Sequence, residues 1–222
     1  MSFEPGAVIP LRLVLLGPSA GAATDVLGAL AQAPLARTAA GAPGSFELLS
    51  AHEIGGTGRI LFSRGLNGIP LQRAPARPLL SYVKAEDSRV KALRVCWLTP
   101  FRLHTDNGYC YDPQQAAERF AAACWSRCVR LCELCCGAAA RPPFRKWEPG
   151  DWWVEECHAY RYEWKRVSLR QSRGMSLDGL VGFCDLYGEL GDVYALSRVA
   201  ELAHVGQKTS FGLGKVRVYV LE

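Results

Sequence analysis

The chain has 222 residues, 49% of them hydrophobic and 21% charged, and a net charge of +5 at neutral pH. This composition is typical of a folded soluble protein with one domain or two small ones, and the mild positive charge permits an acidic partner such as RNA without requiring one. The sequence excludes a membrane span, because no apolar run approaches the roughly 20 residues that a span requires. A signal peptide is not expected either, because the first residues lack a basic segment followed by an apolar one.

The first half of the chain predicts one helix flanked by strands. Apolar periodicity indicates these elements, and a segment rich in alanine, glycine and proline is expected to be a loop. The expected elements are a strand at residues 8–16, a helix at 24–32, a loop at 33–44, and strands at 46–52 and 59–63. Three prolines in residues 70–78 then predict a linker between the two halves.

The second half shows a clearer alternation of strands and helices. A strand at residues 90–98 is expected to end at Thr99 and Pro100. Asp112 and Pro113 indicate a helix start, because aspartate accepts hydrogen bonds from free N–H groups and proline fits the first turn. The remaining expected elements are this helix up to Gly137, a strand at 156–170, a connection at 170–177, a strand at 178–187, a helix at 193–203 and a strand at 215–221.

The order of these elements is β-α-β-β-α-β, which is the ferredoxin-like or RRM-like unit. We therefore expect an α+β fold of tandem ferredoxin-like units, the first one partial. Residues 1–80 are expected to form the partial N-terminal domain and residues 90–222 the C-terminal domain. Tyr160, Tyr162 and Trp164 alternate with charges along one strand, and we expect them to be core residues.

Five of the nine cysteines lie within one predicted helix, at Cys124, Cys128, Cys132, Cys135 and Cys136. At 100° per residue they form an apolar stripe, so we interpret them as small buried hydrophobes. The alternative is a zinc or iron–sulfur site that uses Cys132 and Cys135, but paired metal ligands usually need a turn between them. The odd number argues against a secreted disulfide scaffold, so we expect a reducing cytoplasm and no cofactor.

A basic, glycine-rich loop connects the last predicted helix to the final strand. Gly206, Gly212 and Gly214 allow positive φ angles, and Lys208 and Lys215 place charge beside exposed amide groups. Such a loop is suited to a phosphate-bearing polymer.

Four segments of the second half together resemble a known family. They are Leu98-Thr-Pro-Phe-Arg-Leu103, Ser168-Leu-Arg-Gln-Ser-Arg-Gly-Met175, Leu177-Asp-Gly-Leu-Val-Gly182 and the loop from His204 to Gly214. In order and spacing they are similar to the CRISPR repeat-RNA processing endoribonucleases, the Cas-six family of the RAMP superfamily, from about residue 93 onward. Residues 3–17 are similar to the later part of that family's first domain, which implies a shortened first domain without its usual opening strand and helix.

The resemblance implies metal-independent cleavage of precursor CRISPR RNA and retention of the product in an effector complex. Metal-free scission needs one group to take the 2′-hydroxyl proton and another to stabilise the leaving oxygen. Histidine is suited to this role, so His52 and His104 are the candidate catalytic residues, unless each is a solvated surface side chain. His158 and His204 are more simply explained by packing and by helix capping.

Basic side chains in the same segments are the candidate RNA contacts. The guanidinium group of arginine can donate two parallel hydrogen bonds to one phosphate. The stem of a repeat hairpin is recognised mainly through its sugar–phosphate backbone. The candidates are Arg102, Arg166, Arg170, Arg173, Gly206, Lys208, Gly212, Gly214 and Lys215. We expect a protein that binds the repeat hairpin of CRISPR RNA and cleaves it. The alternatives are a non-catalytic RNA-binding subunit of a CRISPR effector and a redox or metal-binding protein built on the cysteines.

Overall fold

The structure is a computed structural model that describes residues 4, 6–32, 36–37, 43–44, 47–53, 59–64, 70, 72, 89–106, 108–142, 150–168 and 173–222. The side chains of residues 36–37, 43–44, 166–168 and 173 lie outside this description. The chain forms two compact units, Met1–Arg77 and Pro78–Glu222. No helix in the described part of the chain has the length and apolar character that a membrane span requires.

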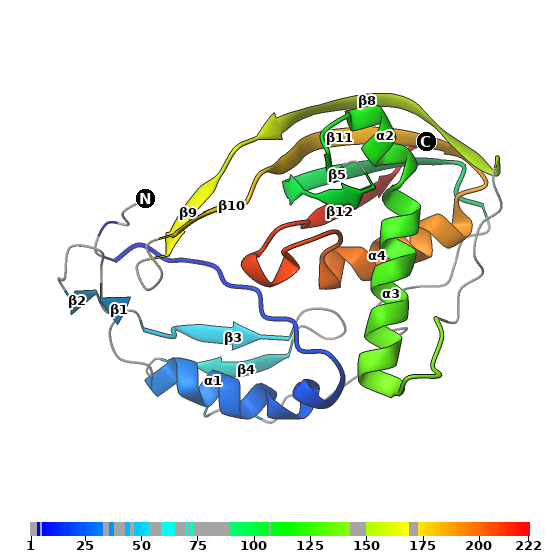
Figure 1. The fold of residues 1–222 in the computed structure, drawn as a ribbon. Helices are drawn as coiled ribbons and strands as arrows, with labels where there is room; N and C mark the ends of the chain where they lie inside the picture. The colour runs from blue at the N-terminus through cyan, green and yellow to red at the C-terminus, as the bar shows by residue number, and fades with distance from the viewer. Residues whose placement is uncertain are drawn as a thin grey trace. The chain divides into compact units, whose positions relative to one another are not determined.

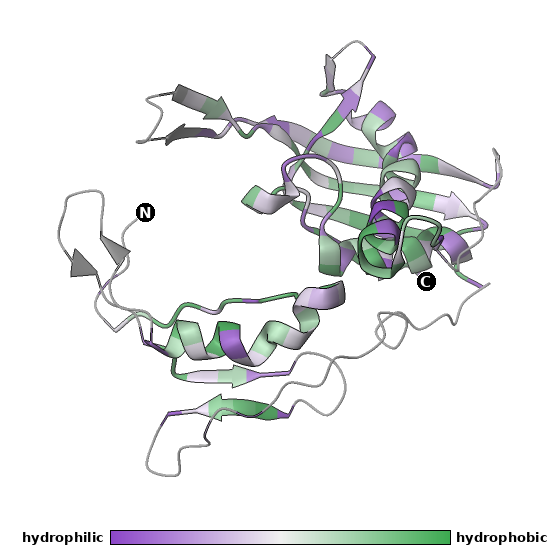
Figure 2. Ribbon diagram, turned by 60° about the horizontal axis from the view of Figure 1, so that its bottom comes forward, coloured by the Kyte–Doolittle hydropathy of each residue, from purple (hydrophilic) through white to green (hydrophobic). Residues whose placement is uncertain are grey.

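The first unit contains one α-helix and two pairs of short antiparallel strands. A 3-10 turn, η1 (Gly17–Ala22), leads into α1 (Ala23–Gln32), and the strands are β1 (Ala36–Arg37) with β2 (Pro43–Gly44) and β3 (Ser50–His52) with β4 (Ile60–Ser63). Hydrophobic residues predominate in α1 and β4 (Figure 2). The helix predicted at 24–32 corresponds to α1 and the strand predicted at 59–63 corresponds to β4, so both are confirmed. The strand expected at 46–52 is only three residues long.

Two predictions for the first unit are wrong. Residues 8–16 do not form a strand. A strand requires a ladder partner for its backbone groups, and no described strand pairs with this segment, whose Val8 and Leu11 are 75% and 74% exposed. The strand at residues 8–16 was therefore predicted wrongly, because apolar composition alone does not show whether a segment has a pairing partner. The expected loop at 33–44 contains the β1–β2 pair, and most of the expected linker at 70–78 lies outside the described residues.

The second unit is a ferredoxin-like fold. Its main elements, in chain order, are β5 (Ala92–Phe101), α2 (Pro113–Glu118), α3 (Phe120–Cys136), β8 (Trp152–Tyr162), β11 (Gly179–Gly188), α4 (Gly191–Ala203) and β12 (Val216–Val220). The four strands form an antiparallel sheet in the order β12-β5-β11-β8 (Figure 1). This arrangement confirms the predicted β-α-β-β-α-β order.

Strand β5 continues through Pro100, although the sequence predicted that it would end there. A proline lacks the N–H group that a sheet ladder needs. The pairing of β5 with β11 shifts register between Leu180 and Gly182, which lie opposite this part of β5. Pro100 therefore lies in a bulge, where the ladder does not need its N–H group.

The long predicted helix is two helices, because it breaks at Arg119 between α2 and α3. Its start is confirmed: the Asp112 carboxylate accepts a hydrogen bond from the Gln115 N–H at 2.7 Å, with Pro113 in the first turn. Its end before Gly137 is also confirmed, since Gly137 has a φ of 107°.

Two additional pairs of strands leave the sheet at one end. The β6–β7 hairpin, β6 (Leu103–Thr105) with β7 (Gly108–Cys110), follows β5 directly and was not predicted. The second pair, β9 (Lys165–Ser168) with β10 (Arg173–Ser176), continues the β8–β11 ladder in the same register, and we call it the arm (Figure 1). The strand expected at 156–170 is therefore divided into β8 and β9, and the connection expected at 170–177 contains β10.

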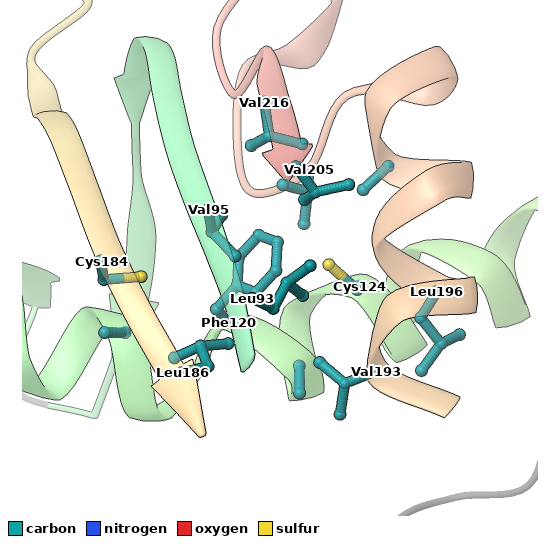
Figure 3. Packing of buried hydrophobic residues seen from close by; sticks show 14 of the residues in the cluster. Leu93, Val95, Phe120, Cys124, Cys184, Leu186, Val193, Leu196, Val205 and Val216 are labelled. Atoms are coloured by element: carbon teal, nitrogen blue, oxygen red, sulfur yellow. The ribbon is translucent and has the colours of Figure 1, made fainter. Parts of the chain in front are cut away.

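The core of the second unit lies between the sheet and the helices α3 and α4. Figure 3 shows the Cys124 sulfur among apolar side chains that include Leu93, Leu196 and Val205. Cys124 and Cys128 are both buried in this cluster. Burial, and then the neighbouring thiol of Cys128, raises the pKa of Cys124 well above its ordinary value, and burial raises that of Cys128 to about 12. These two thiols act as packing groups rather than nucleophiles.

All nine cysteines are free thiols. Among the described residues, no group of three or more histidine, cysteine or acidic side chains is arranged to hold a metal ion. This geometry gives no support to the metal site considered from the sequence.

The prediction that all five cysteines of the stripe are buried is correct only for Cys124 and Cys128, because Cys132 and Cys135 are half-buried and Cys136 is exposed. This difference in burial predicts the order in which the thiols react. Only a thiolate attacks an alkylating reagent, so a buried thiol with a raised pKa reacts slowly. We expect iodoacetamide at pH 8 to modify the exposed Cys136 within minutes and Cys124 only after denaturation. Peptide mass spectrometry measures this order. Rapid labelling of Cys124 in the folded protein would show that α3 does not pack as described.

The aromatic residues on the edge strand are exposed, which contradicts the prediction that they are core residues. Tyr160 is 62% exposed, and Tyr162 and Trp164 are also exposed. In the register of the sheet Tyr160 lies opposite Val181, whereas its neighbour Arg161 lies opposite the buried Leu180. Alternation therefore directs Tyr160 to the face that the helices do not cover. The sequence pattern indicated the alternation correctly but could not show which face is buried.

Candidate nucleic-acid interface

The glycine-rich loop (residues 204–215) is held against the end of β5 by backbone hydrogen bonds. The N–H of Gly214 donates to the Pro100 carbonyl at 3.0 Å, and the N–H of Gln207 donates to the Arg102 carbonyl at 2.9 Å. The Thr99 hydroxyl donates to the Gly212 carbonyl at 2.8 Å and accepts from the Lys215 N–H at 2.9 Å. The Leu98–Leu103 segment is therefore the platform on which the loop is built.

Two glycines in this loop are required by close backbone contacts. A Cβ on Gly214 would lie 1.7 Å from the Val205 carbonyl oxygen, and one on Gly206 would lie 2.6 Å from the Arg102 carbonyl oxygen. Both residues also have positive φ angles, of 69° and 89°. Any side chain at these two positions must open the loop.

The loop presents a basic side chain from a fixed backbone. Lys208 is exposed and has a φ of 59°, which is uncommon for a residue with a side chain. It precedes a 3-10 turn, η3 (Thr209–Phe211), and its carbonyl accepts a hydrogen bond from the Phe211 N–H. Val205 and Leu213 are fully buried and anchor the loop on either side of Lys208. Lys215, half-buried, supplies a second charge.

A buried carboxylate, Asp178, lies where the arm joins the sheet, between the end of β10 and the start of β11. Its side chain is 3% exposed. It accepts hydrogen bonds from Tyr111, from Ser176 at 2.5 Å and from Arg161 at 2.8 Å, and Arg102 lies 3.3 Å away. Burial opposes ionisation of Asp178, but these hydrogen bonds outweigh it and lower its pKa below the usual range. Asp178 therefore stays charged wherever the protein is folded near neutral pH.

The two arginines on Asp178 each cover a tyrosine that follows the β6–β7 turn. The Arg102 guanidinium lies 3.6 Å from the ring centre of Tyr109, and that of Arg161 lies 4.0 Å from the ring centre of Tyr111. His104 in β6 is exposed and meets Tyr109 edge to face, with the ring centres 5.4 Å apart. The carboxylate thus connects the hairpin that carries His104 to the base of the arm.

The arm and the glycine-rich loop emerge from the same end of the sheet (Figure 1). The pairing places the end of β5 next to the start of β11, and the start of β12 beside Trp97. Arg102 contacts both elements, because its carbonyl accepts from the loop while its guanidinium donates to the Ser176 carbonyl of the arm at 2.8 Å. The base of the arm and the glycine-rich loop are therefore neighbours.

A family model for the CRISPR-associated endoribonuclease Cas6 matches residues 95–216. This match covers more than half of the chain and includes the platform, the arm and the glycine-rich loop. The chain belongs to the Cas6 family. No curated protein matches the sequence significantly.

Solved Cas6 structures resemble the chain at low identity. A Thermus thermophilus Cas6 is 16% identical, with 58% of this chain and 53% of that chain covered and a TM-score of 0.41. A Cas6 product complex is 17% identical, with 61% and 54% covered and a TM-score of 0.40. A Cas6-RT-Cas1–Cas2 complex is 16% identical, with 61% and 14% covered and a TM-score of 0.38. The chain spans about half the length of the Cas6 structures it first matches.

The two catalytic candidates lie in different units. His104 lies in the second unit, within the residues that the Cas6 family model matches, and two residues from the platform residue Arg102. His52 ends β3 in the first unit, where it is exposed and outside the matched residues. Of the other two histidines, His158 pairs with Glu156 at 2.5 Å, and His204 contacts the Leu213 carbonyl at 3.1 Å.

The structure describes the side chains of only some of the basic residues that are candidate RNA contacts. Arg166 and Arg173 lie on β9 and β10, but their side chains are outside the description, as is the whole of Arg170. Arg102 was expected to bind phosphate, but its guanidinium is buried and engaged by Asp178, Ser176 and Tyr109. We therefore assign Arg102 a structural role beneath the loop.

Asp178 and the tyrosines that surround it were not predicted as site residues from the sequence. Asp178 lies in the quoted Leu177–Gly182 segment, but its partners Arg102 and Tyr111 are 76 and 67 positions away in the chain. A signal was present, since the sequence predicted a strand from residue 178, and an aspartate is uncommon in a strand. Only the fold shows which residues neutralise it.

Proposed function

We propose that this chain binds the hairpin of CRISPR repeat RNA and cleaves precursor CRISPR RNA beside it without a metal ion. Membership of the Cas6 family supports the substrate class, and the match covers residues 95–216. The observation that carries the proposal is the emergence of the arm and the glycine-rich loop from one end of the sheet. Arg102 holds the base of both elements through its carbonyl and its guanidinium.

The proposed RNA-binding surface consists mainly of basic side chains that contact phosphate groups. Lys208 and Lys215 reach the RNA backbone from the loop, while Arg166, Arg170 and Arg173 reach it from the arm. Gly206, Gly212 and Gly214 allow the loop backbone to approach closely. Such contacts recognise the shape and phosphate spacing of a stem rather than its sequence. This proposal assigns the RNA to the second unit.

The reaction is an in-line displacement within the RNA. The 2′-oxygen attacks the adjacent phosphorus as a base removes its proton, and the bond from phosphorus to the 5′-oxygen breaks. The products are a 2′,3′-cyclic phosphate and a 5′-hydroxyl end, whose proton comes from an acid. His104 is the first candidate for proton transfer, because it is exposed at the same end of the sheet as the loop and arm. His52 is the second candidate.

One assay distinguishes this function from its alternative. Purified protein is incubated with an end-labelled repeat-hairpin RNA in excess chelator, and binding and scission are both recorded. We expect binding and a product with a cyclic phosphate end. Binding without scission would assign the chain as a non-catalytic RNA-binding subunit of a CRISPR effector. The absence of binding would overturn the proposed function as a whole.

A further inference from the structure

Asp178 occupies the junction at which the arm leaves the sheet. Strand β8 ends at Tyr162 and β9 begins at Lys165, while β10 ends at Ser176 and β11 begins at Gly179. The regular strands are thus interrupted on both sides of the ladder at this point, although the hydrogen bond from the Leu177 N–H to the Trp164 carbonyl continues it. An interruption in a two-stranded ladder is where its direction can change.

The Asp178 carboxylate joins three elements at this junction. Ser176 comes from the arm, Arg161 from β8, and Tyr111 from the segment that follows β7. Arg102 adds a fourth connection, since its guanidinium faces Asp178 while its carbonyl holds Gln207 of the glycine-rich loop. Buried charge networks of this kind have few alternative arrangements, because any movement leaves a charge unpaired.

We propose that Asp178 is a positioning residue that fixes the arm and the β6–β7 hairpin relative to the glycine-rich loop. The side chains of these three elements that face the RNA then keep one fixed arrangement when they bind the stem of the hairpin. This inference rests on the proposed function for its consequence in RNA binding. The positioning itself is a property of the free protein, and it can be measured without RNA.

The chain provides a matched control in a second buried aspartate. Asp185 is also nearly buried and accepts a two-pronged ion pair from Arg94, at 2.7 and 2.6 Å. It lies on β11, seven residues from Asp178, which corresponds to roughly 23 Å along an extended strand. Replacing Asp178 by asparagine removes a buried charge from two arginines, and replacing Asp185 removes one from Arg94. Only Asp178 lies at the base of the arm.

The test compares Asp178→Asn with Asp185→Asn by hydrogen exchange in the free protein. We expect Asp178→Asn to speed exchange about tenfold in β7 and β10, whereas Asp185→Asn speeds it only in β5 and β11 around Arg94 and Asp185. The same exchange pattern in both variants would overturn the proposal, because Asp178 would then be one stabilising ion pair among others.

The second measurement uses an RNA hairpin with the repeat sequence and a titration of the active fraction. We expect the dissociation constant of folded Asp178→Asn to rise about tenfold while that of Asp185→Asn stays at the wild-type value. A purely structural role would lower the active fraction and leave the dissociation constant unchanged, which would contradict positioning. If the wild-type protein binds no hairpin, the proposed function fails, and the exchange comparison still decides the role of Asp178.

Discussion

Gly214→Ala is expected to disrupt the glycine-rich loop and weaken hairpin RNA binding at least tenfold. The new methyl group would lie 1.7 Å from the Val205 carbonyl oxygen, which is a backbone atom with no freedom to rotate away. Relief requires the loss of the Val205–Gly214 and Gly214–Pro100 hydrogen bonds that hold the loop. We expect the free energy of unfolding to fall by roughly 3 kcal/mol. Urea denaturation and RNA titration measure the two effects.

Gly212→Ala is the matched control for this prediction. Gly212 also has a positive φ, of 85°, but a Cβ there would meet no atom within 4 Å. The cost is then only that of the left-handed backbone, about 1 kcal/mol. The two variants are compared by their free energy of unfolding, because Gly212 is itself a proposed RNA contact. Equal losses in both variants would mean that backbone conformation, and not the contact with Val205, determines the loop.

His104→Ala is expected to slow cleavage of the repeat hairpin by a factor of about 10² to 10⁴ without weakening its binding. This is the range that general acid–base catalysis by one side chain usually supplies. The imidazole contacts Tyr109 only edge to face and is exposed, so its removal should not unfold the β6–β7 hairpin. Single-turnover cleavage under saturating protein measures the rate, and added imidazole should restore part of it.

His158→Ala is the control for the catalytic prediction. His158 is another exposed histidine of the second unit, but it lies on β8 and pairs with Glu156. Its replacement should leave the cleavage rate unchanged. A normal rate in His104→Ala together with a large loss in His52→Ala would place proton transfer in the first unit and contradict the assignment of His104.

The sequence was sufficient to predict the β-α-β-β-α-β order of the second unit because local signals and the overall pattern agreed. Asp112 and Pro113 begin a helix through hydrogen bonding and geometry that do not depend on the rest of the fold. The elements that it missed depend on tertiary pairing. Residues 8–16 are apolar but pair with no described strand, and the continuation of β5 through Pro100 depends on a bulge opposite β11.

The candidate site could be predicted in part for the same reason. Glycines at tight backbone contacts, such as Gly206 and Gly214, leave a clear pattern in the sequence, and so does a basic loop. The role of Arg102 could not be predicted, because an arginine that binds phosphate and one that neutralises a buried aspartate look alike in a sequence. Its partner Asp178 lies 76 residues away and becomes adjacent only when β11 pairs with β5.

The central claim is that the loop and the arm bind the same RNA stem. The salt dependence of hairpin binding tests this claim most directly. The measurement compares the wild type with Lys208→Ala/Lys215→Ala, with Arg170→Ala/Arg173→Ala, and with the variant that carries all four substitutions. Each phosphate contact that is lost should reduce the slope of log affinity against log salt by about 1. We expect each double variant to reduce the slope by about 2, and the quadruple variant by about 4. An arm variant that binds the hairpin with the wild-type affinity and slope would contradict the account.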